Sequence, residues 1–265
     1  MIIHDETTYR QHAGLNFSSA KNLLKSPLHF KAAQEAKREP SKNMLFGSIV
    51  HAKVLEGKDY PVAVMPDGLD GRTKEGKEWK AANAGKETIS QDDWRQCQRM
   101  IDAVLGNKDV AYLLSLQGES EIGIVQRYQN VEIKGRIDRL FKDEDGKYAI
   151  FDFKTTQSVA PEDFNKSCSS FCYCCQMVWY QNLVALEYGL DAPPAYFWVC
   201  VENSDAADVA IYQPSPEHIA IGQKQMEICI EKYVNYVEKG NFPGYGNGIQ
   251  QLPFSKWEFE KWMNK

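Results

Sequence analysis

Two acidic residues and a lysine on neighbouring predicted strands are the residues of this sequence best suited to chemistry. Asp138 lies in one run of alternating hydrophobic and polar residues, and Asp152 and Lys154 lie in the next such run. Because successive side chains of a strand alternate between its faces, Asp152 and Lys154 share one face, while Phe151 and Phe153 point to the other. Asp138 can reach the first face across the intervening turn. The three residues offer carboxylates to a hard divalent cation such as Mg²⁺ and an ammonium group to an anionic substrate or a nucleophilic water.

A purely structural interpretation of these residues is also open. In it, Asp152 and Lys154 form an ion pair, and Asp138 pairs with Arg136 or Arg139. An ion pair perturbs pKa values as readily as a catalytic site does. However, the hydrophobic neighbours of Asp152 indicate an interior strand, where charged residues are rarely buried without a partner. We therefore expect a functional reason for burying Asp152 and Lys154.

The composition is typical of a soluble globular protein. Hydrophobic residues make up 43% of the 265 residues and charged residues 25%, which excludes disordered and fibrous classes. No stretch approaches the roughly 18 apolar residues of a transmembrane helix, and the N-terminus lacks a signal peptide, so we expect a cytoplasmic protein with no membrane association. The net charge of −5 makes nucleic acid a less expected partner but does not exclude it, because basic groups can gather in one groove.

The elements that must position the acidic residues follow from hydrophobic periodicity. We expect helices at about 20–25, 27–37, 42–57, 92–105, 108–116, 171–188 and 216–239, and strands at about 60–65, 119–128, 131–141, 148–154, 195–202 and 208–213. Helices followed by an antiparallel meander and further helices predict an α/β (α+β) fold, with a central sheet flanked by helices.

We expect a single domain over residues 1–265 with three parts. These are an N-terminal helical segment at about 1–40, a core at 41–213, and a C-terminal helix and tail at 214–265. The tail carries Trp257 and Trp262, and it is expected to pack back on the body, because exposing both rings would create a large apolar patch.

Two further residues near the predicted strands could bind metal. His51 lies inside a predicted helix, one turn after Gly47, which leaves room for a close approach by another backbone or a substrate. A lone histidine on an apolar helix face is otherwise a core residue that hydrogen-bonds to a neighbour. Glu121 begins an alternating run, and a solvated strand residue is an equally good interpretation of it.

Polar residues elsewhere suggest contacts to a phosphate backbone. Gln176 and Tyr180 are four residues apart on one predicted helix, with Tyr173 one turn earlier, so they form a stripe that could face the site or simply border the helix. Ser18 and Ser19 open a short predicted helix whose free N–H groups suit a phosphate, although plain helix capping is the commoner use.

Four motifs in order resemble the PD-(D/E)xK nucleases, in the branch that contains the RecB nuclease domain, lambda-type exonuclease and, most closely, exonuclease VIII (RecE). They are Gly47-Ser-Ile-Val-His51, Gly135-Arg-Ile-Asp138, Asp152-Phe-Lys154 and Gln176-Met-Val-Trp-Tyr180. The segments 18–27 and 70–77 also look like that family's, and the resemblance spans roughly residues 15 to 260. It implies a PD-(D/E)xK, restriction-endonuclease-like core with a central mixed sheet.

The resemblance also implies roles for individual residues. Asp138, Asp152, His51 and the backbone carbonyl of Phe153 would hold Mg²⁺, and a histidine ligand makes Mn²⁺ an alternative. Lys154 would orient or activate the attacking water. Glu121 would contact a metal ligand or hold a second metal. The residues expected to contact DNA are Gln176, Tyr180, Tyr173, Arg72, Lys74, Ser18 and Ser19.

The function implied is a Mg²⁺-dependent exodeoxyribonuclease that degrades one strand of linear double-stranded DNA from its end, 5′ to 3′. The resemblance further implies phage or prophage recombination in a bacterial or phage-infected cell, a single-strand-annealing partner of the RecT type, and a ring-shaped trimer or tetramer around DNA. A structure- or site-specific endonuclease of the same fold and a non-catalytic DNA-binding module remain alternatives.

The cysteines do not suggest a cofactor. There are seven, an odd number that argues for reduced thiols in a chain without an export signal. Relatives with an iron–sulfur cluster use one cysteine upstream of the nuclease core and three close together near the C-terminus. Here no cysteine precedes His51, and Cys172, Cys174 and Cys175 spread around a predicted helix, so no iron–sulfur cluster is expected.

Overall fold

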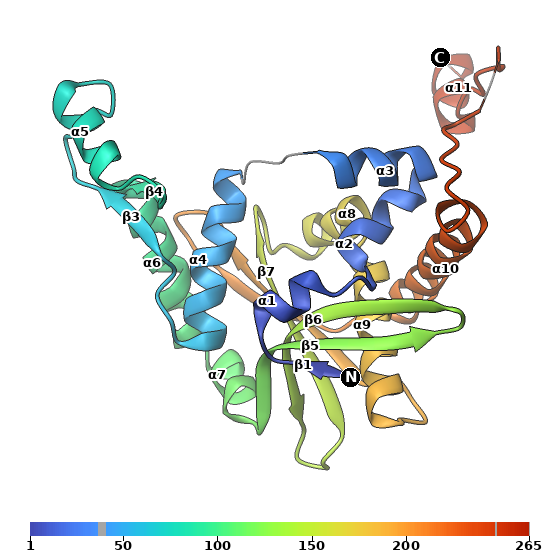
Figure 1. Cartoon of the computed structure of the whole chain (residues 1–265), viewed down its shortest axis with the longest axis horizontal. Coiled ribbons are helices and arrows are strands. Elements are labelled where there is room, and N and C mark those ends of the chain that lie inside the picture. Colours follow the sequence, from blue (N-terminus) through green and yellow to red (C-terminus); the bar gives the residue numbers. More distant parts are fainter. Residues whose placement is uncertain (37–40, 247, 265) are drawn as a thin grey trace.

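A strongly curved mixed sheet forms the centre of the molecule (Figure 1). The computed structural model describes residues 1–36, 41–246 and 248–264. Within these residues seven strands pair in the order β1-β5-β6-β7-β8-β9, with β2 beside β6. Their bounds are β1 Ile2–Ile3, β2 Leu15–Asn16, β5 Gly118–Tyr128, β6 Val131–Lys142, β7 Tyr148–Thr156, β8 Ala195–Glu202 and β9 Val209–Tyr212. The meander from β5 to β7 is antiparallel as predicted, whereas β8 runs parallel to β7.

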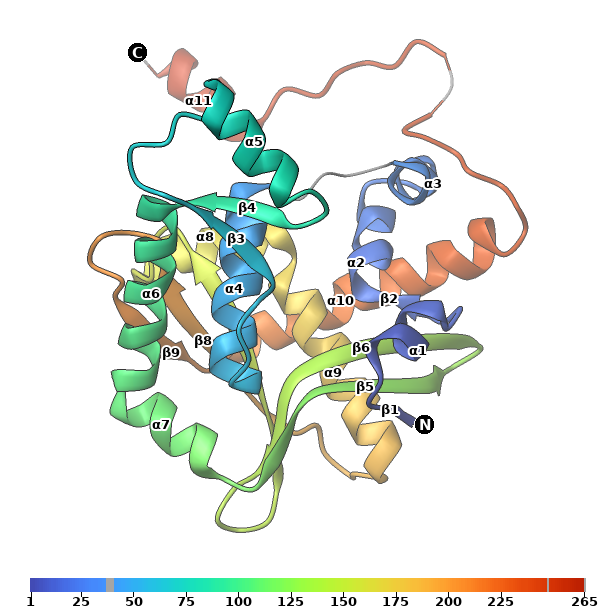
Figure 2. The same ribbon diagram turned by 60° about the vertical axis from the view of Figure 1, so that its left-hand side comes forward.

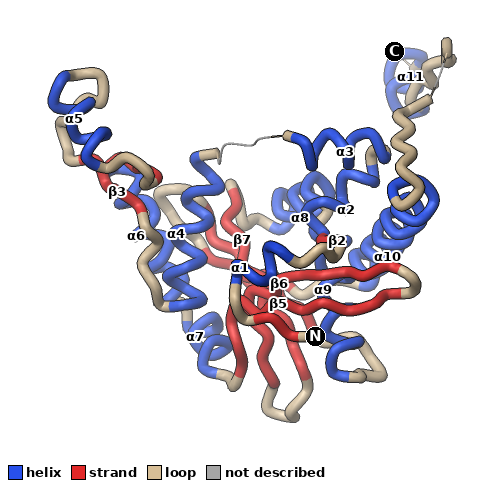
Figure 3. Tube along the Cα trace, viewed as in Figure 1, coloured by secondary structure: helices blue, strands red, loops and turns tan. Residues whose placement is uncertain are grey.

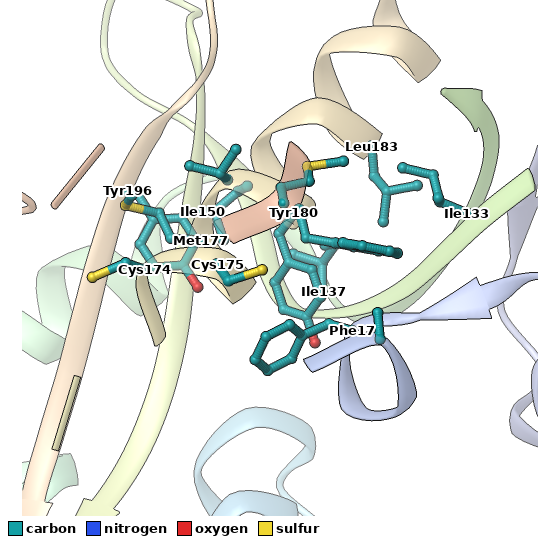
Figure 4. Close-up of a cluster of buried hydrophobic side chains, with 14 of the residues drawn as sticks. Phe17, Ile133, Ile137, Ile150, Cys174, Cys175, Met177, Tyr180, Leu183 and Tyr196 are labelled. Carbon is teal, nitrogen blue, oxygen red and sulfur yellow. The ribbon is translucent and has the colours of Figure 1, made fainter. Parts of the chain in front are cut away.

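Helices cover both faces of this sheet (Figure 3), which confirms the predicted fold class. On one face lie α4 (Lys42–Glu56), α6 (Gln91–Gly106) and α7 (Lys108–Ser115), and on the other α8 (Pro161–Phe171), α9 (Tyr173–Tyr188) and α10 (Pro216–Lys232). Strand β7 contributes to both cores, because Phe151 and Phe153 pack with α4 while Ile150 packs with α9. Figure 4 shows the α9 side of this packing, where Met177 and Leu183 lie among strand residues.

The N-terminal segment and a small second sheet flank this core (Figure 2). The segment contains α1 (Glu6–Gln11), α2 (Phe17–Ala20), a 3₁₀ turn at Lys21–Leu24 and α3 (Pro27–Glu35). The second sheet pairs β3 (Val62–Met65) with β4 (Glu87–Ser90) in parallel, and α5 (Lys74–Ala82) connects them. Strand β4 and helix α5 were not predicted. Helix α5 begins at Lys74 because Thr73 caps it by accepting a hydrogen bond from the Gly76 N–H.

The expected helix at 171–188 is confirmed as α9, whereas α8 before it was not predicted. The left-handed backbone of Cys172, with φ of 59°, ends α8 and begins α9 at Tyr173, whereas Gly189 ends α9 as predicted. Helix α10 likewise ends at Lys232, and a π-helical turn at Tyr233–Val237 follows.

The expectation that the tail packs on the body is wrong. After α10 the chain runs away from the sheet and ends in α11 (Lys256–Met263), where the Trp257 and Trp262 side chains are 68% and 64% exposed. The segment at 240–255 is rich in glycine and contains two prolines, Pro243 and Pro253, so its described residues form no helix or strand that could pack an apolar face on the core. The predicted boundary at residue 40 falls outside the described residues, and the division into three parts stays a prediction. No described helix is long and apolar enough to span a membrane.

Close packing of α9 against α10 yields a test of the fold. A Cβ atom on Gly222 would lie 2.2 Å from the backbone oxygen of Cys174, so Gly222→Ala must push the two helices apart. We expect it to lower the free energy of unfolding by about 1–3 kcal/mol in urea titrations. Gly106→Ala is the matched control, because a Cβ there meets nothing within 4 Å and should leave stability unchanged or slightly higher. Equal stability of the two variants would contradict this packing.

Candidate active site

A histidine and two carboxylates meet where α4 crosses the sheet. The Nδ1 atom of His51 lies 3.1 Å from Oε1 of Glu121, and its Nε2 atom lies 3.4 Å from Oδ2 of Asp138. One ligand atom from each of the three residues lies within 4.8 Å of the others. We call His51, Glu121 and Asp138 the metal-site cluster. Two of its members, His51 and Glu121, line a cavity of about 760 Å³ between α4 and the sheet.

A bend in the meander brings the two carboxylates together. Ile137 and Leu140 pack in the same core although they are three residues apart, so β6 changes the face that it presents between them. The β5–β6 pairing is interrupted between Ser120 opposite Arg139 and Ile122 opposite Ile137, which places Glu121 opposite Asp138. At this point Glu121 adopts a left-handed backbone, with φ of 58°.

The pairing between β6 and β7 also ends beside Asp138. The last pair is Arg139 with Phe151, and beyond it the Oδ2 atom of Asp138 accepts the Phe153 N–H at 2.8 Å. The Asp138 side chain therefore replaces a backbone partner at the gap between the strands. In an extended strand the N–H and C=O of one residue point the same way, so the Phe153 carbonyl also faces this gap.

Asp152 and Lys154 form a buried ion pair on the α9 side of β7. The Asp152 side chain is completely buried, and the Lys154 ammonium contacts its Oδ2 atom. The other oxygen, Oδ1, has no well-aligned hydrogen bond among the described residues, although the Tyr196 hydroxyl lies close to the carboxylate. The Lys154 ammonium also lies over the ring of Tyr173, 4.9 Å from its centroid. Asp152 thus lies outside the metal-site cluster, but it is close enough for the charge of Asp138 to raise its pKa.

The charges of the metal-site cluster are mutually dependent. Burial lowers the pKa of His51, but the carboxylates of Asp138 and Glu121 outweigh burial and raise this pKa to about 9. Burial opposes ionisation of Asp138 too, yet His51 and Lys154 lower its pKa below the ordinary value. The imidazole is therefore protonated at neutral pH when no metal is bound.

Burial has opposite outcomes for the two members of the ion pair. It raises the pKa of Asp152 to about 6, with Asp138 adding to the rise and Lys154 opposing it. Burial would lower the pKa of Lys154, but the nearby carboxylates of Asp152 and Asp138 raise it above its ordinary value. Lys154 is thus a charged donor at neutral pH.

The residues of the predicted stripe on α9 lie near the ion pair and a second cavity. Tyr173 contacts Lys154 as described, and the Gln176 Nε2 atom donates to the Tyr180 hydroxyl at 3.1 Å. Tyr180 also lines a second cavity, of about 340 Å³, beside the first. Gly135 is needed here, because a Cβ on it would lie 2.9 Å from the Tyr180 ring.

The remaining predicted contacts lie at different distances from the cluster. Ser18 lines the second cavity, whereas the Ser19 N–H is bound by Asn16, which is the residue that caps α2. Arg72 and Lys74 lie on the small second sheet's connection, outside the lining of both cavities, and Arg72 pairs with Asp70 at 2.8 Å.

The basic residues of β6 have partners that the sequence did not indicate. Neither Arg136 nor Arg139 pairs with Asp138: Arg136 donates to Oε2 of Glu121, and Arg139 donates to the carbonyls of Leu114 and Leu116. The alternative pairing proposed for Asp138 is therefore wrong. These contacts join positions 15 or more residues apart, so no local pattern could have revealed them.

Lys134 has a structural role that the sequence also did not indicate. Its buried ammonium donates to the backbone oxygens of Tyr9 and His12, at 2.8 and 2.6 Å. These carbonyls end α1, so Lys134 holds this helix beside the cavity.

The donor set fits a divalent metal ion. Buried carboxylate oxygens without a hydrogen bond are costly unless a cation satisfies them, and Asp152 Oδ1 has no well-aligned hydrogen bond among the described residues. The Glu121 Oε1 atom lies 3.1 Å from the His51 imidazole, which a metal ion would also contact. Carboxylates, a backbone carbonyl and one imidazole form a set that suits Mg²⁺ or Mn²⁺.

Comparisons with known proteins agree with this fold. A model of the family described as "PDDEXK-like domain of unknown function (DUF3799)" matches residues 16–252. The crystal structure of a "putative exonuclease" from Eubacterium rectale superposes with a TM-score of 0.61 at 15% identity, covering 93% of this chain and 92% of that one. The crystal structure of SSO0001 matches 69% of this chain and 86% of that one, at 14% identity, but its TM-score of 0.29 supports no argument. No curated protein matches the sequence.

The raised pKa of His51 predicts how the metal-free protein responds to pH. The pKa is about 9 in the folded protein against 6.5 for an unperturbed histidine, so the charged imidazole stabilises the fold fully below pH 6.5, and this contribution is lost as the pH rises toward 9. With a chelator present, the Tm of the wild type should therefore fall between pH 6.5 and 8.5. His51→Gln should lack this fall, and parallel Tm curves for the two proteins would contradict the assignment.

Proposed function

The chain belongs to the family of PDDEXK-like domains of unknown function, and on this premise we propose that it is a metal-dependent nuclease that hydrolyses phosphodiester bonds in DNA. The observation that carries the proposal is the buried Asp152–Lys154 pair beside Asp138, because the ammonium contacts only Oδ2 of Asp152 and leaves Oδ1 without a well-aligned hydrogen bond among the described residues. A purely structural ion pair gains most when its remaining lone pairs are satisfied. The Oδ1 atom of Asp152 instead suits a cation that arrives with the substrate.

Residues on both sides of the gap between β6 and β7 would hold the metal. Asp138 belongs to the metal-site cluster with His51 and Glu121, and Asp152 and the Phe153 carbonyl approach from β7. A bound Mg²⁺ or Mn²⁺ would neutralise charge on the scissile phosphate and lower the pKa of the attacking water. Because His51 carries a proton in the free protein, binding of metal through its imidazole requires that this proton leave.

Lys154 supplies a fixed positive charge next to the reacting phosphate. Its high pKa makes it a hydrogen-bond donor and not a base at neutral pH. It can hold the attacking water and stabilise the negative charge that develops on phosphate oxygens. The Tyr173 ring and the Asp152 carboxylate restrict the ammonium to this position.

The finer assignment follows from the motif order Gly47–His51, Gly135–Asp138, Asp152–Lys154 and Gln176–Tyr180. It supports an exonuclease of the exonuclease VIII type that removes one strand of linear duplex DNA 5′ to 3′ with Mg²⁺. It also supports a recombination role with a single-strand-annealing partner and a ring-shaped trimer or tetramer. Gln176, Tyr180 and Tyr173 would contact the DNA backbone near the scissile phosphate, with Ser18, Ser19, Arg72 and Lys74 contributing further along.

Isosteric substitutions test the catalytic assignment. Asp138→Asn, Asp152→Asn and Lys154→Met should each reduce DNA cleavage by at least about 100-fold, the loss typical when a group that stabilises transition-state charge is removed. Rates on linear duplex DNA with Mg²⁺ are the measurement, and circular dichroism checks folding. Asp145→Asn is the matched control, because Asp145 lies in the same hairpin with its side chain 77% exposed. A folded variant with full activity would remove its residue from the mechanism.

End-labelled DNA tests the type of cleavage. We expect early release of the label from linear duplex DNA carrying it at the 5′ end, slow release from the 3′ end, and no reaction on a covalently closed circle. Cleavage of the circle would favour a structure- or site-specific endonuclease. Binding without hydrolysis in either Mg²⁺ or Mn²⁺ would favour a non-catalytic DNA-binding module.

A further inference from the structure

The junction between α8 and α9 places an exposed aromatic ring beside the ion pair. Phe171 is the last residue of α8, and its side chain is 52% exposed. Among the described residues before 240, the other strongly exposed large aromatic side chain is Tyr112, whose hydroxyl donates to Glu144. Phe171 thus presents a ring face to solvent with no polar group of its own.

The backbone is strained in a way that positions this ring. Residues two apart in a helix do not face each other, yet the rings of Phe171 and Tyr173 stack, with centroids 5.5 Å apart and planes inclined by 26°. The left-handed conformation of Cys172 makes this stacking possible. Such a conformation costs a non-glycine residue about 1–3 kcal/mol and persists where the surroundings require it.

The stacked rings lead from solvent to the ion pair. The Lys154 ammonium lies over one face of Tyr173, and Phe171 stacks on the same residue. Phe164 supports Tyr173 from the core, with centroids 6.1 Å apart. Two lysines lie within electrostatic range of the junction, since the charges of Lys21 and Lys25 oppose the rise in the pKa of the Cys172 thiol that burial causes, and the Lys21 ammonium lies over the Phe17 ring.

We propose that Phe171 is a stacking platform for a nucleobase of the cleaved strand, next to the phosphate held at Lys154. An exposed ring with flanking basic groups is the arrangement by which proteins hold single-stranded nucleic acid without reading its sequence. The inference rests on the proposed nuclease function and adds to it a binding site for a base. It requires the cleaved strand to leave its duplex partner at the site, because a paired and stacked base has no free face.

Binding to DNA without metal tests this platform apart from catalysis. The probe is a fluorescent linear duplex in chelator, with an abasic nucleotide placed at each terminal position in turn, and affinity is measured by fluorescence anisotropy. Phe171→Ala and Phe171→Leu should weaken binding of intact DNA roughly ten-fold, since one lost base stack gives that order of effect. Phe171→Trp should retain wild-type affinity. Ile221→Ala is the matched control, because Ile221 is also 52% exposed but lies on α10, and it should bind normally.

The abasic probes decide between a platform and a general surface effect. At one position, loss of the base should weaken the wild type about as much as Phe171→Ala does and should not weaken Phe171→Ala further. Independent losses at every position, or wild-type affinity of Phe171→Ala, would overturn the inference even if the enzyme cleaves DNA. A wild type that neither binds nor cleaves DNA would overturn both this inference and the proposed function.

Discussion

Electrostatic repulsion among three carboxylates is the constraint around which this molecule is arranged. Glu121, Asp138 and Asp152 gather at the gap between β6 and β7, where burial weakens the screening of their charges. In the free protein the cations of His51, Lys154 and Arg136 balance them. Lys154 contacts one oxygen of Asp152 and leaves the other without a well-aligned hydrogen bond among the described residues, so the charges balance while one carboxylate oxygen stays open to a further cation. A metal ion could bind the open carboxylate oxygen and bring a phosphate substrate with it.

The basic residues of β6 explain how a sheet can carry such a site. Arg136 holds Glu121 and leaves its other oxygen turned toward His51. Lys134 caps the end of α1, and Arg139 binds the carbonyls that end α7. Side chains of β6 on both sides of the bend at Asp138 therefore hydrogen-bond to neighbouring elements and hold the strand in place. These interactions let the sheet bend at the site and still keep its register, because the pairing of β5 with β6 resumes unchanged beyond Glu121.

Local periodicity predicted the strands and helices that position the site, because a half-buried strand repeats every second residue and an amphipathic helix every third or fourth. Periodicity could not predict contacts between residues that are far apart in the sequence. The sequence placed Glu121 only as a secondary candidate, since its contact with His51 depends on a bend that no repeat encodes. The same limit applies to the break at Cys172, where a cysteine replaces the glycine that would signal a left-handed residue. The tail was mispredicted because exposed tryptophans are unusual in a globular protein.

The location of backbone strain connects the two ends of the site. Among the described residues, left-handed conformations outside glycine occur at Glu121, Gln129, Cys172 and Ala207. Gln129 and Ala207 lie in turns, where such conformations are ordinary. Glu121 lies within a strand and Cys172 between two helices, and each positions a side chain that borders the metal-site cluster or Lys154. Strained backbone conformations cluster at functional sites. The strain at Cys172 therefore supports a functional role for the exposed ring of Phe171, as the strain at Glu121 does for the carboxylates.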